Sequence, residues 1–157
     1  MSMTEISDLL SNQTKGFSLQ QKFYKDPGIY QQEMDRIFMK SWLYAGHVSQ
    51  IKNVGEYFLY EMDTESVIII REDKDTVNAL MNVCRHRGSR VCLQASGTQK
   101  LLVCPYHGWT YERSGALRSA NHTYPDFDKS GYALKTVNLK IFHGMIFINF
   151  DKDPISF

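Results

Sequence analysis

Two short segments of the sequence each pair a cysteine with a histidine. One residue separates Cys84 from His86, two separate Cys104 from His107, and seventeen lie between His86 and Cys104. Thiolate and imidazole are common metal ligands, and such short spacing lets one loop supply both ligands of a pair. The four side chains therefore predict one metal centre, either a zinc ion or a [2Fe–2S] cluster in which two His replace two Cys on one iron.

The mixing of one Cys with one His in each pair favours the cluster. A zinc finger typically places two Cys together and then two His three to five residues apart. In a two-iron cluster, each loop can give its Cys to one iron and its His to the other, so that both loops hold both irons. Gly88 and Gly108 follow where the backbone must bend close to the cluster, and Pro105 stiffens the second loop. Core filling by unliganded side chains would not explain two such pairs.

Both motifs resemble those of the Rieske non-haem iron oxygenases, in the N-terminal domain of the large (alpha) subunit. The shared motifs are Cys-Arg-His-Arg-Gly at 84–88 and Cys-Pro-Tyr-His-Gly-Trp-Thr-Tyr at 104–111. The resemblance extends from about Phe17 to the strand that ends at Phe150. The runs 21–24 and 42–47 resemble the branch that acts on quaternary ammonium compounds such as glycine betaine, alongside aromatic-ring hydroxylases. The fold implied is mainly β, a Rieske-type antiparallel β-sandwich or small barrels with an N-terminal helix and two cluster-binding loops.

The resemblance also implies a function in electron transfer. A ferredoxin or flavin reductase would supply electrons, which the domain would pass across a subunit boundary, in a homotrimer, to a mononuclear Fe(II) for O2-dependent hydroxylation or demethylation. That iron belongs to a C-terminal catalytic domain, and we find no helical His pair with a following carboxylate in this sequence. We therefore expect no catalytic residue here and a chain that only transfers electrons. A stand-alone Rieske ferredoxin is the alternative, which a predicted helix from Asp26 to Ser41 disfavours.

The residues around the four ligands are expected to tune and shield the cluster. High-potential Rieske proteins place a serine where this chain has Trp109, so we expect a potential near the low end of the Rieske range, roughly −150 mV. The segment 84–118 has six basic residues and one acid, Glu112. The basic residues either attract an acidic electron donor, or they cap carbonyls and pair with acids in a neighbouring domain. The basic residues are Arg85, Arg87, Arg90, Lys100, Arg113 and Arg118. The residues expected next to the ligands are Arg85, Arg87, Gly88, Tyr106, Gly108, Trp109 and Tyr111.

Composition sets the remaining expectations. The chain has 157 residues and a net charge of +1, so bulk charge indicates neither nucleic acid nor a membrane surface as partner. Without a membrane-length apolar run or a signal-peptide pattern, we expect a cytoplasmic protein. Cys92 is left over from the ligand pairs and is expected to pack as a small apolar residue. His47, His122 and His143 lack paired ligands and are expected to be ordinary histidines.

The order of elements predicts a short arm followed by one domain. We expect residues 1–16 to form a loose arm with a short helix at Thr4–Leu10, and residues 17–157 to form the Rieske domain. In the helix that begins at Asp26, an apolar stripe should pack against a sheet. The stripe consists of Tyr30, Met34, Ile37 and Phe38. The expected strands are 43–47, 57–61, 67–71, 77–83, 100–103, 109–112, 116–118 and 145–150.

Overall fold

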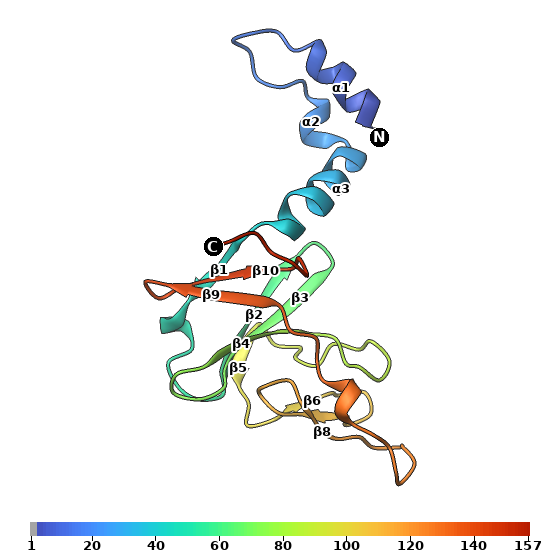
Figure 1. Cartoon of the computed structure of the whole chain (residues 1–157), viewed down its shortest axis with the longest axis vertical. Coiled ribbons are helices and arrows are strands. Elements are labelled where there is room, and N and C mark those ends of the chain that lie inside the picture. The colour runs from blue at the N-terminus through green and yellow to red at the C-terminus, as the bar shows by residue number, and fades with distance from the viewer. Residues whose placement is uncertain (1–2) are drawn as a thin grey trace. The chain divides into compact units, whose positions relative to one another are not determined.

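A computed structural model describes residues 3–157 of the chain, and these form two compact units (Figure 1). The helical unit comprises the described residues up to Trp42 together with Phe150–Phe157, and the β unit comprises Leu43–Asn149. No helix within residues 3–157 has both the length and the apolar character needed to cross a bilayer. That residues 1–16 are a loose arm stays a prediction.

The helical unit begins with three helices. These are α1 (Met3–Ser11), α2 (Lys22–Lys25) and α3 (Pro27–Arg36). α1 confirms the predicted short helix. α3 begins as its sequence predicts, because the carboxylate of Asp26 accepts hydrogen bonds from the amides of Gly28 and Ile29 at 2.8 and 3.1 Å, and proline occupies the first helical position.

The end of α3 differs from the prediction. The helix stops at Arg36 rather than Ser41, since Ile37 adopts a φ of −115°, and a 3-10 turn, η1 (Phe38–Lys40), follows. The predicted stripe is wrong for three of its four members, because Tyr30, Ile37 and Phe38 are exposed. Ile37 and Phe38 lie beyond the helix end and no longer continue its face. The residues that α3 buries are Ile29 and Met34.

Three antiparallel sheets build the β unit, which confirms the predicted mainly β fold. The first has the order β1-β10-β9, with β1 (Leu43–His47), β9 (Asn138–Phe142) and β10 (Met145–Asn149). The second has the order β4-β3-β2-β5, with β2 (Glu56–Met62), β3 (Glu65–Arg71), β4 (Val77–Met81) and β5 (Ser96–Thr98). The third has the order β6-β7-β8, with β6 (Leu102–Val103), β7 (Thr110–Tyr111) and β8 (Leu117–Ser119). Two short 3-10 turns, η2 (Val48–Gln50) and η3 (Ser130–Tyr132), lie between strands.

The hydrophobic core of the β unit includes the two cysteines of the predicted metal centre. Ile68, Ile70 and Leu80 of the four-stranded sheet pack in one cluster with Cys84 and Cys104. The other buried members are Tyr57, Val91, Cys92, Leu102, Trp109, Tyr111, Leu117 and Leu134. Side chains from two sheets and from both cluster loops thus share one core, which holds the loops against the sheets.

Candidate metal centre

The first of the two loops follows β4 and carries Cys84 and His86. The amide of Cys84 donates to the carbonyl of Ser89 at 2.8 Å, and the amide of Gly88 donates to the carbonyl of Cys84 at 3.0 Å. Gly88 adopts a φ of 74°, which an L residue rarely adopts. These bonds close the loop into a tight turn with the cysteine at its base.

The second loop, between β6 and β7, repeats this construction. The amide of Cys104 donates to the carbonyl of Trp109 at 2.8 Å, and that of Gly108 donates to the carbonyl of Cys104 at 3.0 Å. Gly108 has a φ of 71°. The same two bonds and the same glycine position recur, although the histidine follows its cysteine by three residues here and by two in the first loop. The loops therefore form a matched pair of turns, each of which carries one cysteine and one histidine of the predicted ligand set.

The structure brings the four predicted ligand residues together. The thiols of Cys84 and Cys104 are buried and close enough to interact, and the imidazole rings of His86 and His107 lie 4.6 Å apart at 71°. Burial raises the pKa of the Cys84 thiol above its ordinary value, while hydrogen bonds with Tyr111 and the His86 amide act in the opposite direction. Burial lowers the pKa of His107, and the neighbouring His86 and Arg87 add to that effect, which favours the neutral ring that metals bind.

The donor atoms fit a two-iron cluster. The Nδ1 atoms of His86 and His107 are both buried and have no hydrogen-bond partner in the described chain, an arrangement that costs free energy unless a ligand satisfies them. A [2Fe–2S] cluster of the Rieske type needs two thiolates on one iron and two imidazoles on the other. Two buried thiols and two unsatisfied imidazole nitrogens are that donor set.

Tyr111 lies beneath the first loop and is fully buried. Its hydroxyl lies 3.2 Å from Sγ of Cys84 and accepts a hydrogen bond from the amide of Arg85 at 3.0 Å. Because the oxygen already accepts, its proton is free to point at the sulfur. Burial raises the pKa of Tyr111, so the phenol stays protonated and can donate to a Cys84 thiolate.

Replacing Tyr111 with phenylalanine is expected to lower the midpoint potential of the bound cluster. The phenol bond stabilises negative charge on sulfur and does so more strongly after reduction. A differential loss of about 1 kcal/mol corresponds to roughly 40 mV for one electron. Potentiometric titration followed by visible absorption measures the shift. An unchanged potential would show that this hydroxyl does not act on the cluster.

Two aromatic side chains lie against the histidine rings. The indole of Trp109 stacks on His86 with centroids 4.9 Å apart and planes 9° from parallel. The ring of Tyr106, which is exposed, lies 3.8 Å from that of His107. The ring of His122, a residue expected to be unrelated to the site, lies 6.3 Å from His107. The histidine side of the centre is thus covered in part by a buried indole and an exposed tyrosine ring.

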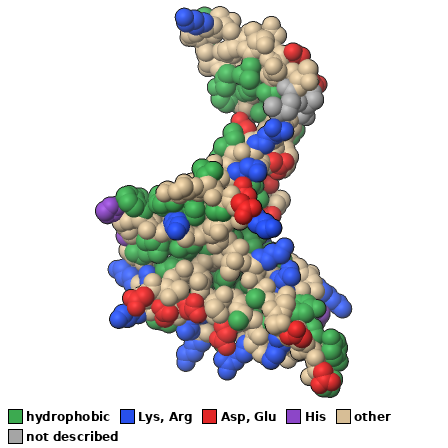
Figure 2. All heavy atoms as spheres, in the orientation of Figure 1, with side chains coloured by type: hydrophobic (Ala, Val, Ile, Leu, Met, Phe, Trp, Pro, Cys, Tyr) green, Lys and Arg blue, Asp and Glu red, His purple; other side chains and the backbone are tan. Residues whose placement is uncertain are grey.

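The structure separates the six basic residues into engaged ones and ones without a partner in the described chain. Three are engaged locally: Arg90 bonds both carboxylate oxygens of Glu61, Arg118 pairs with Glu112, and Arg113 donates to backbone carbonyls. The side chains of Arg85, Arg87 and Lys100 have no ion pair or hydrogen bond within residues 3–157. Over the visible surface of the β unit in Figure 2, Lys and Arg side chains are interspersed with Asp and Glu. Two of the three unpartnered basic residues, Arg85 and Arg87, therefore lie on the first ligand loop.

Sequence reasoning missed Asn82, which holds the first loop closed. This fully buried amide donates to the carbonyl of Cys92 at 2.8 Å and to the hydroxyl of Ser66 at 3.1 Å. Its oxygen accepts from the amides of Val91 and Cys92 at 3.0 and 2.8 Å. All the hydrogen bonds of the side chain are made, and they tie both ends of the segment 82–92 together. The sequence did contain one signal of this role, because Asn82 is a polar residue directly after an apolar strand and two positions before the predicted ligand Cys84.

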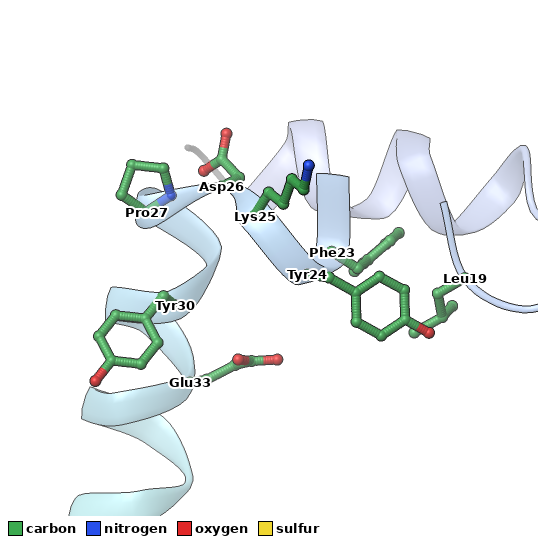
Figure 3. A pocket seen from close by; sticks show the side chains of 8 residues that line it. All are labelled: Leu19, Phe23, Tyr24, Lys25, Asp26, Pro27, Tyr30 and Glu33. Carbon is green, nitrogen blue, oxygen red and sulfur yellow. The ribbon is translucent and has the colours of Figure 1, made fainter. Parts of the chain in front are cut away.

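A separate hollow of about 500 Å³ lies in the helical unit, beside α2 and the start of α3 (Figure 3). Tyr30 and Glu33 extend to opposite sides in this view, and the carboxylate of Asp26 is occupied as the cap of α3. The remaining lining residues are Leu19, Phe23, Tyr24, Lys25 and Pro27. The side chains do not converge on a common point, and the hollow has no arrangement of groups that would bind a ligand.

Comparison with known proteins gives relatives for nearly the whole chain. It is 40% identical over 149 residues to the glycine betaine monooxygenase oxygenase subunit of Chromohalobacter salexigens, covering 94% of this chain and 34% of that one. It is 33% identical to the benzene 1,2-dioxygenase alpha subunit of Pseudomonas putida, covering 86% and 31%. The chain thus spans about a third of the length of the curated relatives it matches. Since these are oxygenase subunits, they favour an oxygenase-type domain over a stand-alone ferredoxin.

Solved structures agree with this relationship. Naphthalene 1,2-dioxygenase from Rhodococcus sp. superposes with a TM-score of 0.86 at 28% identity, covering 98% of this chain and 36% of that one. The quaternary ammonium Rieske monooxygenase CntA superposes with a TM-score of 0.79 at 30% identity, covering 87% and 39%. The family model described as the Rieske [2Fe–2S] domain matches residues 41–139, which include both ligand loops. The chain therefore belongs to the Rieske [2Fe–2S] domain family.

Proposed function

We propose that Cys84, His86, Cys104 and His107 hold a Rieske [2Fe–2S] cluster, and that the domain carries electrons within an oxygenase alpha subunit. The observation that carries the proposal is the presence of two buried, unsatisfied Nδ1 atoms and two buried thiols on two matched loops. When bound, such a cluster gains and loses one electron at a time. The likeness to oxygenase subunits supports the same proposal.

The residues around such a centre have different roles. Cys84 and Cys104, each 2% exposed, keep water from the sulfur side. Tyr111 and the His86 amide donate hydrogen bonds toward Cys84, which stabilises negative charge there. His86 and His107 are only half-buried, so the imidazole side is the side that another protein can approach. Electrons would enter and leave through this side.

In the full protein, we propose that the electrons reach a mononuclear iron for O2-dependent hydroxylation or demethylation. A quaternary ammonium compound such as glycine betaine is the proposed substrate class, supported by the higher identity to the glycine betaine enzyme than to the benzene enzyme. A ferredoxin or flavin reductase is the proposed donor, and a homotrimer with electron transfer between subunits is the proposed assembly. The proposed location is the cytoplasm.

Spectroscopy of the purified chain tests the cluster directly. Iron, zinc and acid-labile sulfide are measured on one sample, and the EPR spectrum is recorded after dithionite reduction. The expected result is two irons and two sulfides per chain with a rhombic Rieske-type signal. One zinc ion and no signal, after anaerobic reconstitution with iron and sulfide has been attempted, would overturn the proposal.

Reversing the charge of Arg85 and Arg87 together is expected to slow reduction by an acidic donor. Both side chains are exposed, unpaired within the described chain and adjacent to the ligands, so they are placed to attract negative charge. At low ionic strength, the second-order rate should fall about ten-fold or more, with the difference shrinking as salt is added. Stopped-flow mixing with a reduced [2Fe–2S] ferredoxin of negative net charge measures this rate.

The matched control is Lys74→Glu with Lys140→Glu. Both lysines are exposed, and Lys74 lies in the β3–β4 turn, at the opposite end of β4 from Cys84. The control makes the same change in net charge. Equal slowing in both double variants would show that net charge, rather than the arginines beside the ligands, governs the reaction.

A further inference from the structure

The turn at Ala120–Thr123 follows β8 and lies against the second ligand loop. The hydroxyl of Thr123 donates to the carbonyl of Ala120 at 3.0 Å and closes the turn. His122 adopts a left-handed φ of 61°, a conformation more accessible to His and Asn than to most residues. The chain therefore reverses immediately after Asn121, and both the carbonyl and the side chain of Asn121 meet the loop.

Asn121 contacts three consecutive residues of that loop. Its carbonyl accepts a hydrogen bond from Nε1 of Trp109 at 3.1 Å. Its side-chain amide donates to the carbonyl of His107 at 3.4 Å, and a Cβ placed on Gly108 would come within 2.7 Å of the same nitrogen. Asn121 thus packs directly on the backbone at Gly108 and bonds to the residues on either side of it.

These contacts reach both histidines of the centre. The side chain of Asn121 bonds the backbone carbonyl of His107 directly. The carbonyl of Asn121 holds the indole of Trp109, and this indole stacks nearly parallel on the ring of His86. One residue outside the ligand motifs is therefore connected to the backbone of His107 and, through Trp109, to the imidazole of His86.

The histidine rings need such support. Metal-binding histidines usually donate their second ring N–H to a carboxylate or carbonyl, which fixes the ring orientation. Within residues 3–157, the rings of His86 and His107 make no hydrogen bond with any side chain or carbonyl. Ring packing and the shape of the loop are the contacts that remain to orient them in the described chain.

We propose that Asn121 is a positioning residue that fixes the orientation of both histidine rings, through its hydrogen bond to the His107 carbonyl and through Trp109. The inference rests on the proposed cluster, because it concerns how the cluster's ligands are held. Substituting Asn121 removes the side-chain bond that fastens the turn to the second loop. The backbone carbonyl at position 121 remains but is no longer held in place beside the indole, so the loop and the indole adopt a range of positions and the imidazole donors meet iron in a range of geometries.

The experiment compares Asn121→Ala, Asn121→Asp and Trp109→Phe with the wild-type chain. Aspartate keeps the shape of asparagine but lacks the donor, and phenylalanine can still stack but lacks the indole N–H. In all three variants, the reduced cluster should show broader or shifted EPR features. At a fixed solution potential, the ratio of reduced to oxidised cluster should change about three-fold or more, which is half a decade on the one-electron Nernst scale.

Asn53→Ala is the matched control. Asn53 is an exposed turn asparagine that bonds Glu56 ahead of β2, so its loss tests the effect of removing a surface asparagine. Wild-type spectra and potential in Asn121→Ala would overturn the proposal, as would an Asn121→Asp variant that behaves like wild type. A wild-type chain that takes up no cluster even after anaerobic reconstitution would instead overturn the proposed function, so the two failures are distinguishable.

A readout that does not need the cluster completes the test. In a Trp42→Phe background, Trp109 is the remaining tryptophan, and its fluorescence reports its stacking on His86. Asn121→Ala should shift or broaden this emission in the cluster-free chain. If thermal unfolding changes but emission, EPR and potential do not, Asn121 has only a structural role and the proposal is wrong.

Discussion

Replacing Cys84 with serine is expected to leave the chain almost without bound iron, whereas replacing Cys92 with alanine leaves the iron content unchanged. Both thiols are buried in the same core, but only Cys84 lies on a ligand loop beside Cys104 and Tyr111. A serine hydroxyl is a poor replacement for a thiolate on iron. Since metal binding contributes free energy to folding, the Cys84 variant should also unfold at a lower temperature than the loaded wild-type chain.

Iron and sulfide analysis after anaerobic reconstitution measures the effect, with thermal unfolding followed by circular dichroism. Cys92→Ala controls for the loss of a buried sulfur, which should cost about 1 kcal/mol in packing. Burial raises the pKa of Cys92 to about 11, so this thiol is neutral at ordinary pH. Full iron content in Cys84→Ser, or loss of iron in Cys92→Ala, would mean that the ligand assignment is wrong.

Replacing Asn82 with alanine is expected to lower the free energy of unfolding by about 3–5 kcal/mol. The substitution leaves the amides of Val91 and Cys92 and the carbonyl of Cys92 without their partner inside the protein. Each buried group left unsatisfied costs about 1–3 kcal/mol. Because the same bonds close the segment that bears Cys84 and His86, the variant should also lose its cluster faster on exposure to a chelator.

Urea unfolding of the wild-type and variant chains measures the first effect. Asn78→Ala is the matched control, since Asn78 lies on β4, the strand that Asn82 follows, but is only half-buried and bonds Glu72 and the carbonyl of Arg113. It should cost about 1 kcal/mol. If the two alanine variants are equally stable, the network around Asn82 does not hold the loop.

The predicted strands were right where a local apolar pattern carried them, as in β1 and β2–β4. β5 (Ser96–Thr98) and β9 (Asn138–Phe142) were missed. β5 is short, polar and exposed, and it is a strand because it pairs with β2, a partner some forty residues away in the sequence. Because this pairing depends on the assembled sheet, the local sequence of β5 does not indicate a strand. The end of α3 was missed because Ile37 leaves the helical conformation without a Gly or Pro to mark the site.

In the candidate site, too, local features could be predicted from the sequence and long-range contacts could not. Ligand types, spacing and the two loop glycines were readable in the sequence because they lie within a few residues of one another. The roles of Asn82 and Asn121 depend on contacts across ten and fourteen residues, made by side chains whose type has many other uses. The sequence also could not separate the engaged arginines from the free ones, because Glu61 reaches Arg90 across twenty-nine residues.

The thiols of Cys84 and Cys104 are part of the hydrophobic core and not an addition to its surface. A chain that lacks its metal therefore lacks the bonds that would join two of its core residues, at the place where two sheets meet. Such a chain opens more often in this region, and open chains exchange amide hydrogens and are cleaved by proteases. The supply of iron would in this way set how long each copy of the protein survives.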